Sequence, residues 1–137
     1  MNIIRKAKLE NVNEMIQWML QAISAHRELS KKTEMDLRLI SDEILSNITF
    51  YAYEGTEGNM ELSVEFDNHT QDIILCFMDS GIEFNPLESE DPNVNADIME
   101  REIGGLGIYF TKEISKAVSW VREDGINKLT VIKGYES

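Results

Sequence analysis

Residues 60–81 of this 137-residue chain read MELSVEFDNHTQDIILCFMDSG. From Met60 to Phe66 every second residue is apolar and those between are glutamate or serine, the pattern of a strand with one buried face. The polar DNHT then interrupts the pattern before an apolar run from Ile73 to Met78. We therefore expect two antiparallel strands joined by a turn.

A short strand and two helices are predicted before this pair. Residues 2–9 alternate loosely, and Asn11 with Glu14 three positions later resembles the start of a helix. Apolar residues recur at helical spacing from about 11 to 29. A second stripe, without glycine or proline, ends near Gly55. Its apolar members are Leu37, Ile40, Ile44 and Ile48.

The part of the chain after these strands predicts a loop, a helix and a hairpin. Residues 82–103 contain both prolines and show no clear period, whereas helical spacing returns from Leu106 to Val118. The segments SWVRE and NKLTVIK flank Asp-Gly, which readily adopts positive φ, so a closing hairpin is expected. The order strand, helix, helix, strand, strand, loop, helix, strand, strand predicts an α+β sandwich. No repeat or linker divides it, so we expect one domain over residues 1–137.

Composition excludes several partners. Twenty-five acidic residues against 13 Lys plus Arg give a formal net charge of −12, which repels nucleic acids and anionic membranes. Cys76 is the only cysteine, so an internal disulfide is excluded and a reducing compartment is favoured. The opening MNIIRKAKLE turns charged too soon for a signal peptide, and we expect a cytoplasmic protein. Trp18, Trp120 and Phe110 occupy apolar positions where core packing is expected.

Glu43 and Asn47 are four residues apart in the second predicted helix and therefore share a face, with Tyr51 one turn further. This row borders the apolar stripe, where an unpaired polar group is costly and a ligand could satisfy it. A solvated helix edge is the alternative interpretation.

Four of the eight glycines, Gly81, Gly104, Gly105 and Gly107, flank the long loop. The GGLG segment opens a predicted helix, whose free backbone N–H groups and dipole favour phosphate oxygens. Glycine at a loop–helix junction is also ordinary turn chemistry. No GxxxxGK[ST] or early GxGxxG motif is present, so the common nucleotide-binding folds lose their support.

Asp79, Ser80 and Gly81 end the apolar strand. An aspartate there could accept a hydrogen bond from an exocyclic amine, and Gly81 would let a flat base approach the backbone. An ordinary Asp-Ser-Gly turn is the alternative.

Three segments in this order, DEILSN with ITFYAY, DSGIEFNP and GGLGIYFTKEI, resemble the nucleotide-binding boxes of the GHKL (Bergerat) ATPases, the superfamily of gyrase, Hsp90, histidine kinases and MutL. Within it, the chain is most similar to the short anti-sigma-factor serine/threonine kinases, from about Glu10 to the end. The resemblance implies a two-layer α/β sandwich whose mixed or mostly antiparallel sheet is covered on one face by helices.

The resemblance also implies roles for individual residues. Asn47 would bind a Mg²⁺ that bridges the ATP phosphates, and Glu43 would act as general base. Asp79 would contact the adenine amino group, Gly81 would line the base pocket, and Thr130 would support the adenine through water. Residues 87–103 would form a lid over the ATP. The phosphates would be received by the backbone of Gly104, Gly105, Leu106 and Gly107.

Two positions depart from the pattern of these kinases. Tyr51 stands where they often have histidine, and Ile103 stands near the place of their lid arginine. Arg101 and Lys112 are candidate replacements for the missing phosphate charge partner, and an ordinary surface charge is the alternative for each.

The implied function is an ATP-dependent serine/threonine protein kinase that also binds a sigma factor and phosphorylates a STAS-type antagonist, in the family's manner as a homodimer. The first alternative is a nucleotide-gated binding module that clamps a partner without transferring phosphate. Intact Glu43 favours the kinase, and the absent lid arginine favours the module. An unrelated α+β protein without a nucleotide is the second alternative.

Overall fold

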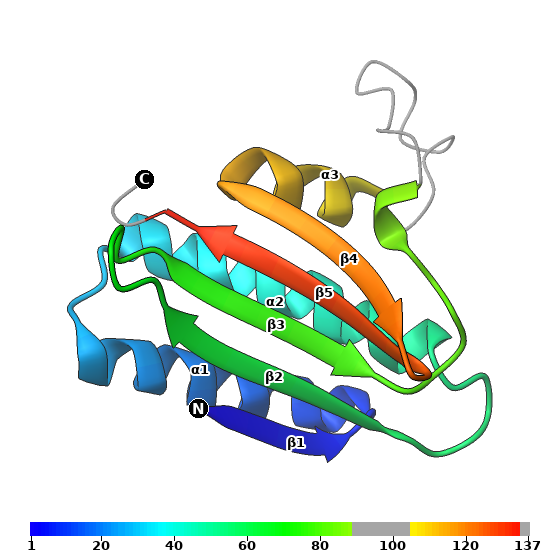
Figure 1. The fold of residues 1–137 in the computed structure, drawn as a ribbon. Coiled ribbons are helices and arrows are strands. Elements are labelled where there is room, and N and C mark those ends of the chain that lie inside the picture. Colours follow the sequence, from blue (N-terminus) through cyan, green and yellow to red (C-terminus); the bar gives the residue numbers. More distant parts are fainter. Residues whose placement is uncertain (89–104, 135–137) are drawn as a thin grey trace.

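The computed structural model describes residues 1–88 and 105–134 and has the expected order of elements (Figure 1). The elements are β1 (Asn2–Lys6), α1 (Leu9–His26), α2 (Lys31–Tyr51), β2 (Asn59–Phe66), β3 (Ile73–Asp79), the short 3₁₀ turn η1 (Pro86–Glu88), α3 (Gly105–Ile114), β4 (Ala117–Glu123) and β5 (Ile126–Lys133). In this part of the chain, no helix is both long and apolar enough to cross a bilayer.

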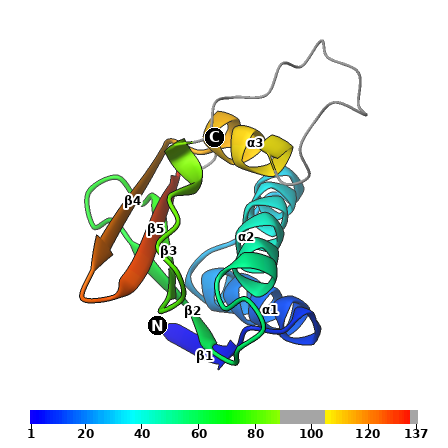
Figure 2. The same cartoon turned by 90° about the vertical axis from the view of Figure 1, so that its right-hand side faces the viewer.

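The strands form one sheet in the order β1-β2-β3-β5-β4, and each neighbouring pair is antiparallel. Figure 2 shows the sheet edge-on, with the three helices on one of its faces. This arrangement confirms the predicted two-layer α+β sandwich with helices on one face.

The core lies between the helices and the inner face of the sheet. Because side chains alternate along a strand, Leu75 and Phe77 of β3 point to the helices and are 0% and 1% exposed. Met15 and Met19 on α1 and Leu37 on α2 are fully buried against them. The helical stripes seen in the sequence therefore face the strands that were predicted from residues 60–81.

The first helix begins two residues earlier than expected. Lys8 is its N-cap and makes no side-chain cap hydrogen bond. Asn11, which the sequence suggested as the start signal, instead donates its side-chain amide to the Lys6 carbonyl at 3.0 Å. The second helix does have a side-chain cap, because Ser30 accepts a hydrogen bond from the Thr33 backbone N–H at 3.2 Å.

The third helix is shorter than expected. It ends at Ile114, and Val118 lies in β4. Phe110 was predicted to pack in the core, but it is 43% exposed, because the buried side of α3 is the one that carries Ile108 and Thr111. Trp18 and Trp120 are partly buried and pack against the core as expected. Cys76 is buried, with 6% of its surface exposed.

The β4–β5 hairpin turns at Asp124 and Gly125, whose φ angles are 52° and 78°. Two consecutive positive φ values are the mark of a type I′ turn, which matches the twist of the strands it joins. The Asp-Gly signal in the sequence is thus confirmed. The same turn sets the pairing of Glu123 with Ile126 and, with it, the register of the hairpin.

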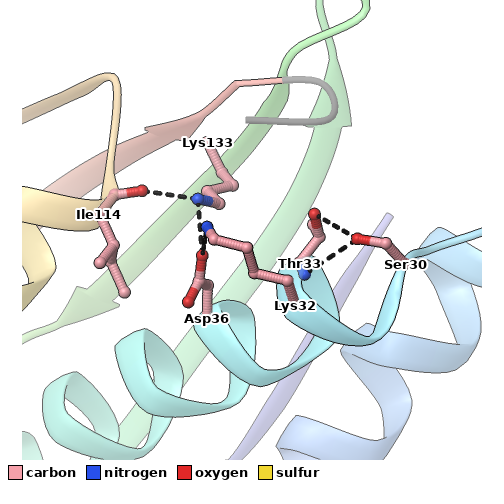
Figure 3. A network of polar contacts seen from close by, with 6 residues as sticks. All are labelled: Ser30, Lys32, Thr33, Asp36, Ile114 and Lys133. Carbon is pink, nitrogen blue, oxygen red and sulfur yellow. Dashed lines mark hydrogen bonds and ion pairs between the residues drawn. The ribbon is translucent and has the colours of Figure 1, made fainter.

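A buried ion pair joins the far end of the sheet to two helices (Figure 3). Lys133, at the end of β5, is 1% exposed and donates to Asp36 Oδ2 at 3.0 Å and to the Ile114 carbonyl at 2.7 Å. Lys32 also reaches Asp36 at 3.0 Å. A cation at the C-terminus of α3 complements the helix dipole there. This contact ties the last residue of α3 to the end of β5.

Candidate functional site

Glu43 and Asn47 lie side by side on α2, as their spacing predicts. The Asn47 side-chain amide donates to Glu43 Oε1 at 3.2 Å. Both side chains are half-buried. Asn47 Oδ1 accepts no hydrogen bond from residues 1–88 or 105–134, so this oxygen is available to a ligand. Tyr51, one turn further along α2, is 47% exposed.

Partial burial makes Glu43 a stronger base than an exposed glutamate. Burial raises the pKa of its carboxyl, and the nearby charge of Asp42 raises it further, whereas the hydrogen bond from Asn47 opposes the shift. A carboxylate whose pKa is raised toward neutrality is better matched to taking a proton from a hydroxyl. Glu43 therefore has the electrostatic setting of a general base.

The end of β3 is joined to the end of α2 through Gly81. A Cβ at Gly81 would lie 2.2 Å from the Ala52 carbonyl oxygen, so only glycine fits. The next residue, Ile82, donates its backbone N–H to the same carbonyl at 2.9 Å. Asp79, which is 9% exposed, accepts the Gly81 N–H at its Oδ1 at 2.9 Å. The Asp-Ser-Gly segment and the polar row of α2 thus belong to one site.

The first turn of α3 also reaches this site. A Cβ at Gly107 would lie 1.8 Å from Cδ of Glu43. Gly105 and Leu106 are the first two residues of α3. Gly104 and Arg101 lie outside the described residues. Lys112 is in the last turn of α3, away from the Gly107 end, and does not line the hollow described next.

A largely apolar hollow lies between α2, the end of β3 and the hairpin. Three polar side chains line it, namely Asn47, Asp79 and Asn127. The rest of the lining is Ile44, Ile48, Tyr51, Ala52, Phe77, Ile82, Phe84, Pro86, Ile108, Trp120 and Leu129. Its volume is about 40 Å³. Three residues of its lining, Tyr51, Ile82 and Phe84, are each nearly half exposed, so surface side chains form part of its boundary.

The structure does not bring Thr130 to this hollow. In the β3–β5 register Thr130 is paired with Cys76, and its hydroxyl is 3.9 Å from the Cys76 sulfur. Because alternate residues of β5 point to opposite faces, Thr130 lies on the face without helices, while Asn127 and Leu129 line the hollow. The role that the resemblance implied for Thr130 does not fit this position.

Sequence reasoning missed three residues near the hollow. Asn127 donates to Asp79 Oδ1 at 3.0 Å, and Arg122 donates to Asn127 Oδ1 at 3.1 Å. The indole Nε1 of Trp120 is buried and has no hydrogen-bond partner within the part of the chain that the structure describes. Because side chains alternate along a strand, the sequence does predict that Asn127 and Thr130 lie on opposite faces of β5. Only the register with β3 shows that Asn127 is the residue opposite Asp79.

The residues present fit magnesium and a nucleotide. Mg²⁺ prefers oxygen ligands, and Asn47 offers an amide oxygen beside the Glu43 carboxylate. Gly81 and Gly107 let their backbone segments pack directly on Ala52 and Glu43, where a Cβ would clash, and so bring the end of β3 and the start of α3 up to the α2 row. Asp79 supplies an acceptor for an amino group in a largely apolar hollow.

Two comparisons with known proteins identify relatives of this chain. Residues 6–133 match the family model of the histidine kinase-like ATPase domain. The chain is also 26% identical over 113 residues to the "Serine/threonine-protein kinase BtrW" of Bordetella bronchiseptica. That similarity covers 82% of this chain and 78% of the relative, so the match includes the α2 row, the end of β3 and the start of α3.

Proposed function

The chain belongs to the family of histidine kinase-like ATPase domains, and from this premise we propose that it is an ATP-dependent serine/threonine protein kinase of the anti-sigma-factor type. Membership of an ATPase family implies that it binds ATP. The phosphorylation of a protein hydroxyl is the further step of the proposal. It is supported by the similarity to a protein named as a serine/threonine kinase.

The observation that carries the proposal is the contact among Glu43, Asn47 and Gly107. A half-buried carboxylate with a raised pKa lies beside a free amide oxygen, and the first turn of α3 packs directly on that carboxylate. This is the inventory that phosphoryl transfer needs, because its catalysis depends mainly on positioning and on stabilising charge. A module that only binds nucleotide has no use for the base.

In the proposed reaction Glu43 accepts the proton of a serine or threonine hydroxyl of the protein substrate. The hydroxyl oxygen forms a bond to the γ-phosphorus of ATP, the bond from that phosphorus to the β–γ bridging oxygen breaks, and ADP leaves. Mg²⁺, held by Asn47 Oδ1, would supply positive charge to the phosphate oxygens. Asp79 would hold the adenine amino group, and Gly81 would let the base approach the backbone.

The backbone N–H groups at the start of α3 would receive the phosphates. This role falls to Gly104, Gly105, Leu106 and Gly107, since the first N–H groups of a helix have no intrahelical partner. Of the two cations suggested for the remaining phosphate charge, we assign Arg101, because Lys112 lies in the last turn of α3, at the other end of the helix from Gly107. We further propose that a STAS-domain protein is the substrate, that a sigma factor is the second partner, and that the kinase acts as a homodimer in the cytoplasm.

The decisive experiment incubates the protein with γ-labelled ATP, magnesium and a STAS-domain protein, and compares the wild type with Glu43→Gln. The wild type is expected to label a serine or threonine, and the variant to lose about 10²- to 10⁴-fold in rate. Calorimetry should show that both proteins bind Mg–ATP. Glu113→Gln, an exposed glutamate on α3, is the matched control and should retain the wild-type rate.

Two results contradict the proposal in different ways. If the wild type binds Mg–ATP but labels no protein, and Glu43→Gln changes nothing, the chain is the ATP-gated binding module. If the wild type binds no Mg–ATP, the nucleotide site itself is wrong.

A further inference from the structure

The side-chain amide of Asn127 uses its full hydrogen-bonding capacity in one corner of the hollow. Its Nδ2 donates to Asp79 Oδ1 at 3.0 Å and to the Ile82 carbonyl at 2.6 Å. Its Oδ1 accepts from the Phe84 backbone N–H at 3.3 Å and from Arg122 Nη1 at 3.1 Å. An asparagine amide has two N–H donors and one oxygen with two lone pairs, so all four places are taken.

These contacts also determine which way the amide points. In the flipped orientation the oxygen would face the Asp79 carboxylate and the Ile82 carbonyl, while the NH₂ would face two donors. Such an arrangement loses all four hydrogen bonds of the amide and places its oxygen against two acceptors and its NH₂ against two donors. Asn127 is 5% exposed, so water offers little compensation.

Arg122 extends the same network to the segment after β3. Its Nη1 donates to the Gly81 carbonyl at 3.0 Å as well as to Asn127. The β4–β5 hairpin therefore holds the backbone of residues 81–84 at three points, namely the Gly81 carbonyl, the Ile82 carbonyl and the Phe84 N–H. This segment forms one wall of the hollow.

The network leaves one oxygen of Asp79 for a ligand. Oδ1 accepts both the Gly81 N–H and the Asn127 amide, whereas Oδ2 accepts nothing from residues 1–88 or 105–134. We propose that Asn127 is the positioning residue for base recognition: it holds Asp79 by Oδ1 so that Oδ2 accepts the exocyclic amine of the nucleotide base. This inference rests on the proposed function, because it names how the nucleotide site selects its base.

Asn127 acts through Asp79 and not by touching the base, since its own amide is saturated. The charged or titratable side chains near this corner are Asp79 from β3, Arg122 from β4, Tyr51 from α2 and the exposed Glu83 of the segment after β3. Asp79 is the carboxylate that contacts Asn127, and in the wild type it faces an N–H of that residue. Aspartate at position 127 would replace this N–H donor by a second carboxylate without changing the size of the side chain.

The variant Asn127→Asp therefore gives a readout that loss of packing alone would not produce. One of its oxygens replaces Nδ2 and faces Asp79 Oδ1 and the Ile82 carbonyl, and two carboxylates in contact hold a shared proton with a raised pKa. We expect the affinity for Mg–ATP to fall about tenfold or more at about pH 8 and to recover toward the wild-type value at about pH 5. The wild type is measured at both pH values as the reference.

The second measurement is the selectivity of the site for the nucleotide base. It is made on the variant Asn127→Ser, which keeps the test available if Asn127→Asp does not fold. Inosine triphosphate lacks the exocyclic amine, so the wild type should bind ATP more tightly than ITP. In Asn127→Ser the short side chain cannot span to Asp79, and the ratio of the two affinities should fall toward one. Val64→Ala, which removes buried packing in β2 (Val64 is 1% exposed), is the control for lost stability and should keep the ratio.

The outcomes separate this inference from the proposed function. If the wild type binds ATP and both Asn127 variants keep its affinity, its pH profile and its ATP/ITP ratio, the positioning role of Asn127 is wrong while the nucleotide site stands. If the wild type binds neither nucleotide, both fall.

Discussion

Glu43 on α2 and Gly107 on α3 pack so closely that no side chain fits between them. A Cβ at Gly107 would lie 1.8 Å from Cδ and 2.2 Å from Oε2 of Glu43, far inside van der Waals contact. Gly107 is the third residue of α3. The glycine therefore sets the distance between the N-terminal turn of α3 and the proposed base, and makes this turn part of the proposed active site.

Gly107→Ala should damage catalysis far more than stability. The new methyl group must displace the Glu43 carboxylate, which is the flexible end of a side chain and can move. Alanine in a helix is favoured over glycine by about 1 kcal/mol, which offsets part of the packing cost. We expect kcat for phosphoryl transfer to fall by about tenfold or more, in line with a misplaced general base, with only a small change in Tm. Glu113→Ala on the same helix should change neither.

Glu43→Gln should stabilise the protein at neutral pH. The pKa of Glu43 is raised in the folded state above its ordinary value of 4.5, so its stabilising contribution is complete below that value and is lost as pH rises through the folded pKa. Glutamine has no charge to desolvate. The variant should gain stability relative to the wild type between about pH 4 and pH 8, by no more than about 1 kcal/mol. Urea unfolding at several pH values measures this gain, and a pH-independent difference would contradict the assignment.

Asn47→Ala should abolish the stabilisation of the fold by Mg–ATP. A ligand present at about 100 times its Kd stabilises a protein by about 2.7 kcal/mol, which is readily seen as a rise in Tm. Without the Asn47 amide oxygen the metal loses a protein ligand, so the rise should shrink or vanish. Asn13→Ala, an exposed asparagine on α1, is the control. Chelating the magnesium in the wild type should reproduce the behaviour of Asn47→Ala.

Breaking the buried ion pair from one side should cost more than removing both partners. Asp36→Asn leaves Lys133 charged and 1% exposed, and such a loss costs about 3–5 kcal/mol. Lys133→Met removes that charge but leaves the Ile114 carbonyl without its donor. The double variant Asp36→Asn/Lys133→Met should be more stable than Asp36→Asn alone, which a double-mutant cycle by urea unfolding would detect. Simple additivity of the two single changes would show that the pair is not coupled.

The same pair should contribute to acid unfolding. Although burial alone would raise the pKa of Asp36, the hydrogen bonds from Lys133 and Lys32 lower it below its ordinary value of 3.8. The stability it contributes is therefore present above that value and is lost as pH falls through the lower folded pKa. The wild type should lose this contribution below about pH 4, and the double variant should lack that part of the pH dependence.

Features that depend on residues close together in the chain could be predicted from the sequence. The order of helices and strands follows from apolar periodicity, and the Asp124-Gly125 turn from the ease with which these residues adopt positive φ. The hydrogen bond between Asn47 and Glu43 follows from their spacing on one helix. The end of α3 was placed too late because Val118, four residues after Ile114, continues the helical spacing, and the pattern alone does not show that the chain has already entered β4 there.

Which residues meet across the sheet was decided by tertiary structure alone. Asp79 faces Asn127 and not Thr130 because of the β3–β5 register, and a shift of one residue would turn the whole strand over. The contact of Gly107 with Glu43 and the burial of Lys133 beside Asp36 likewise join residues far apart in the chain. Local spacing determines which side chains share a helix face. The close packing of the helices on the sheet determines which side chains from different elements touch, and the chemistry of the proposed site depends on this packing.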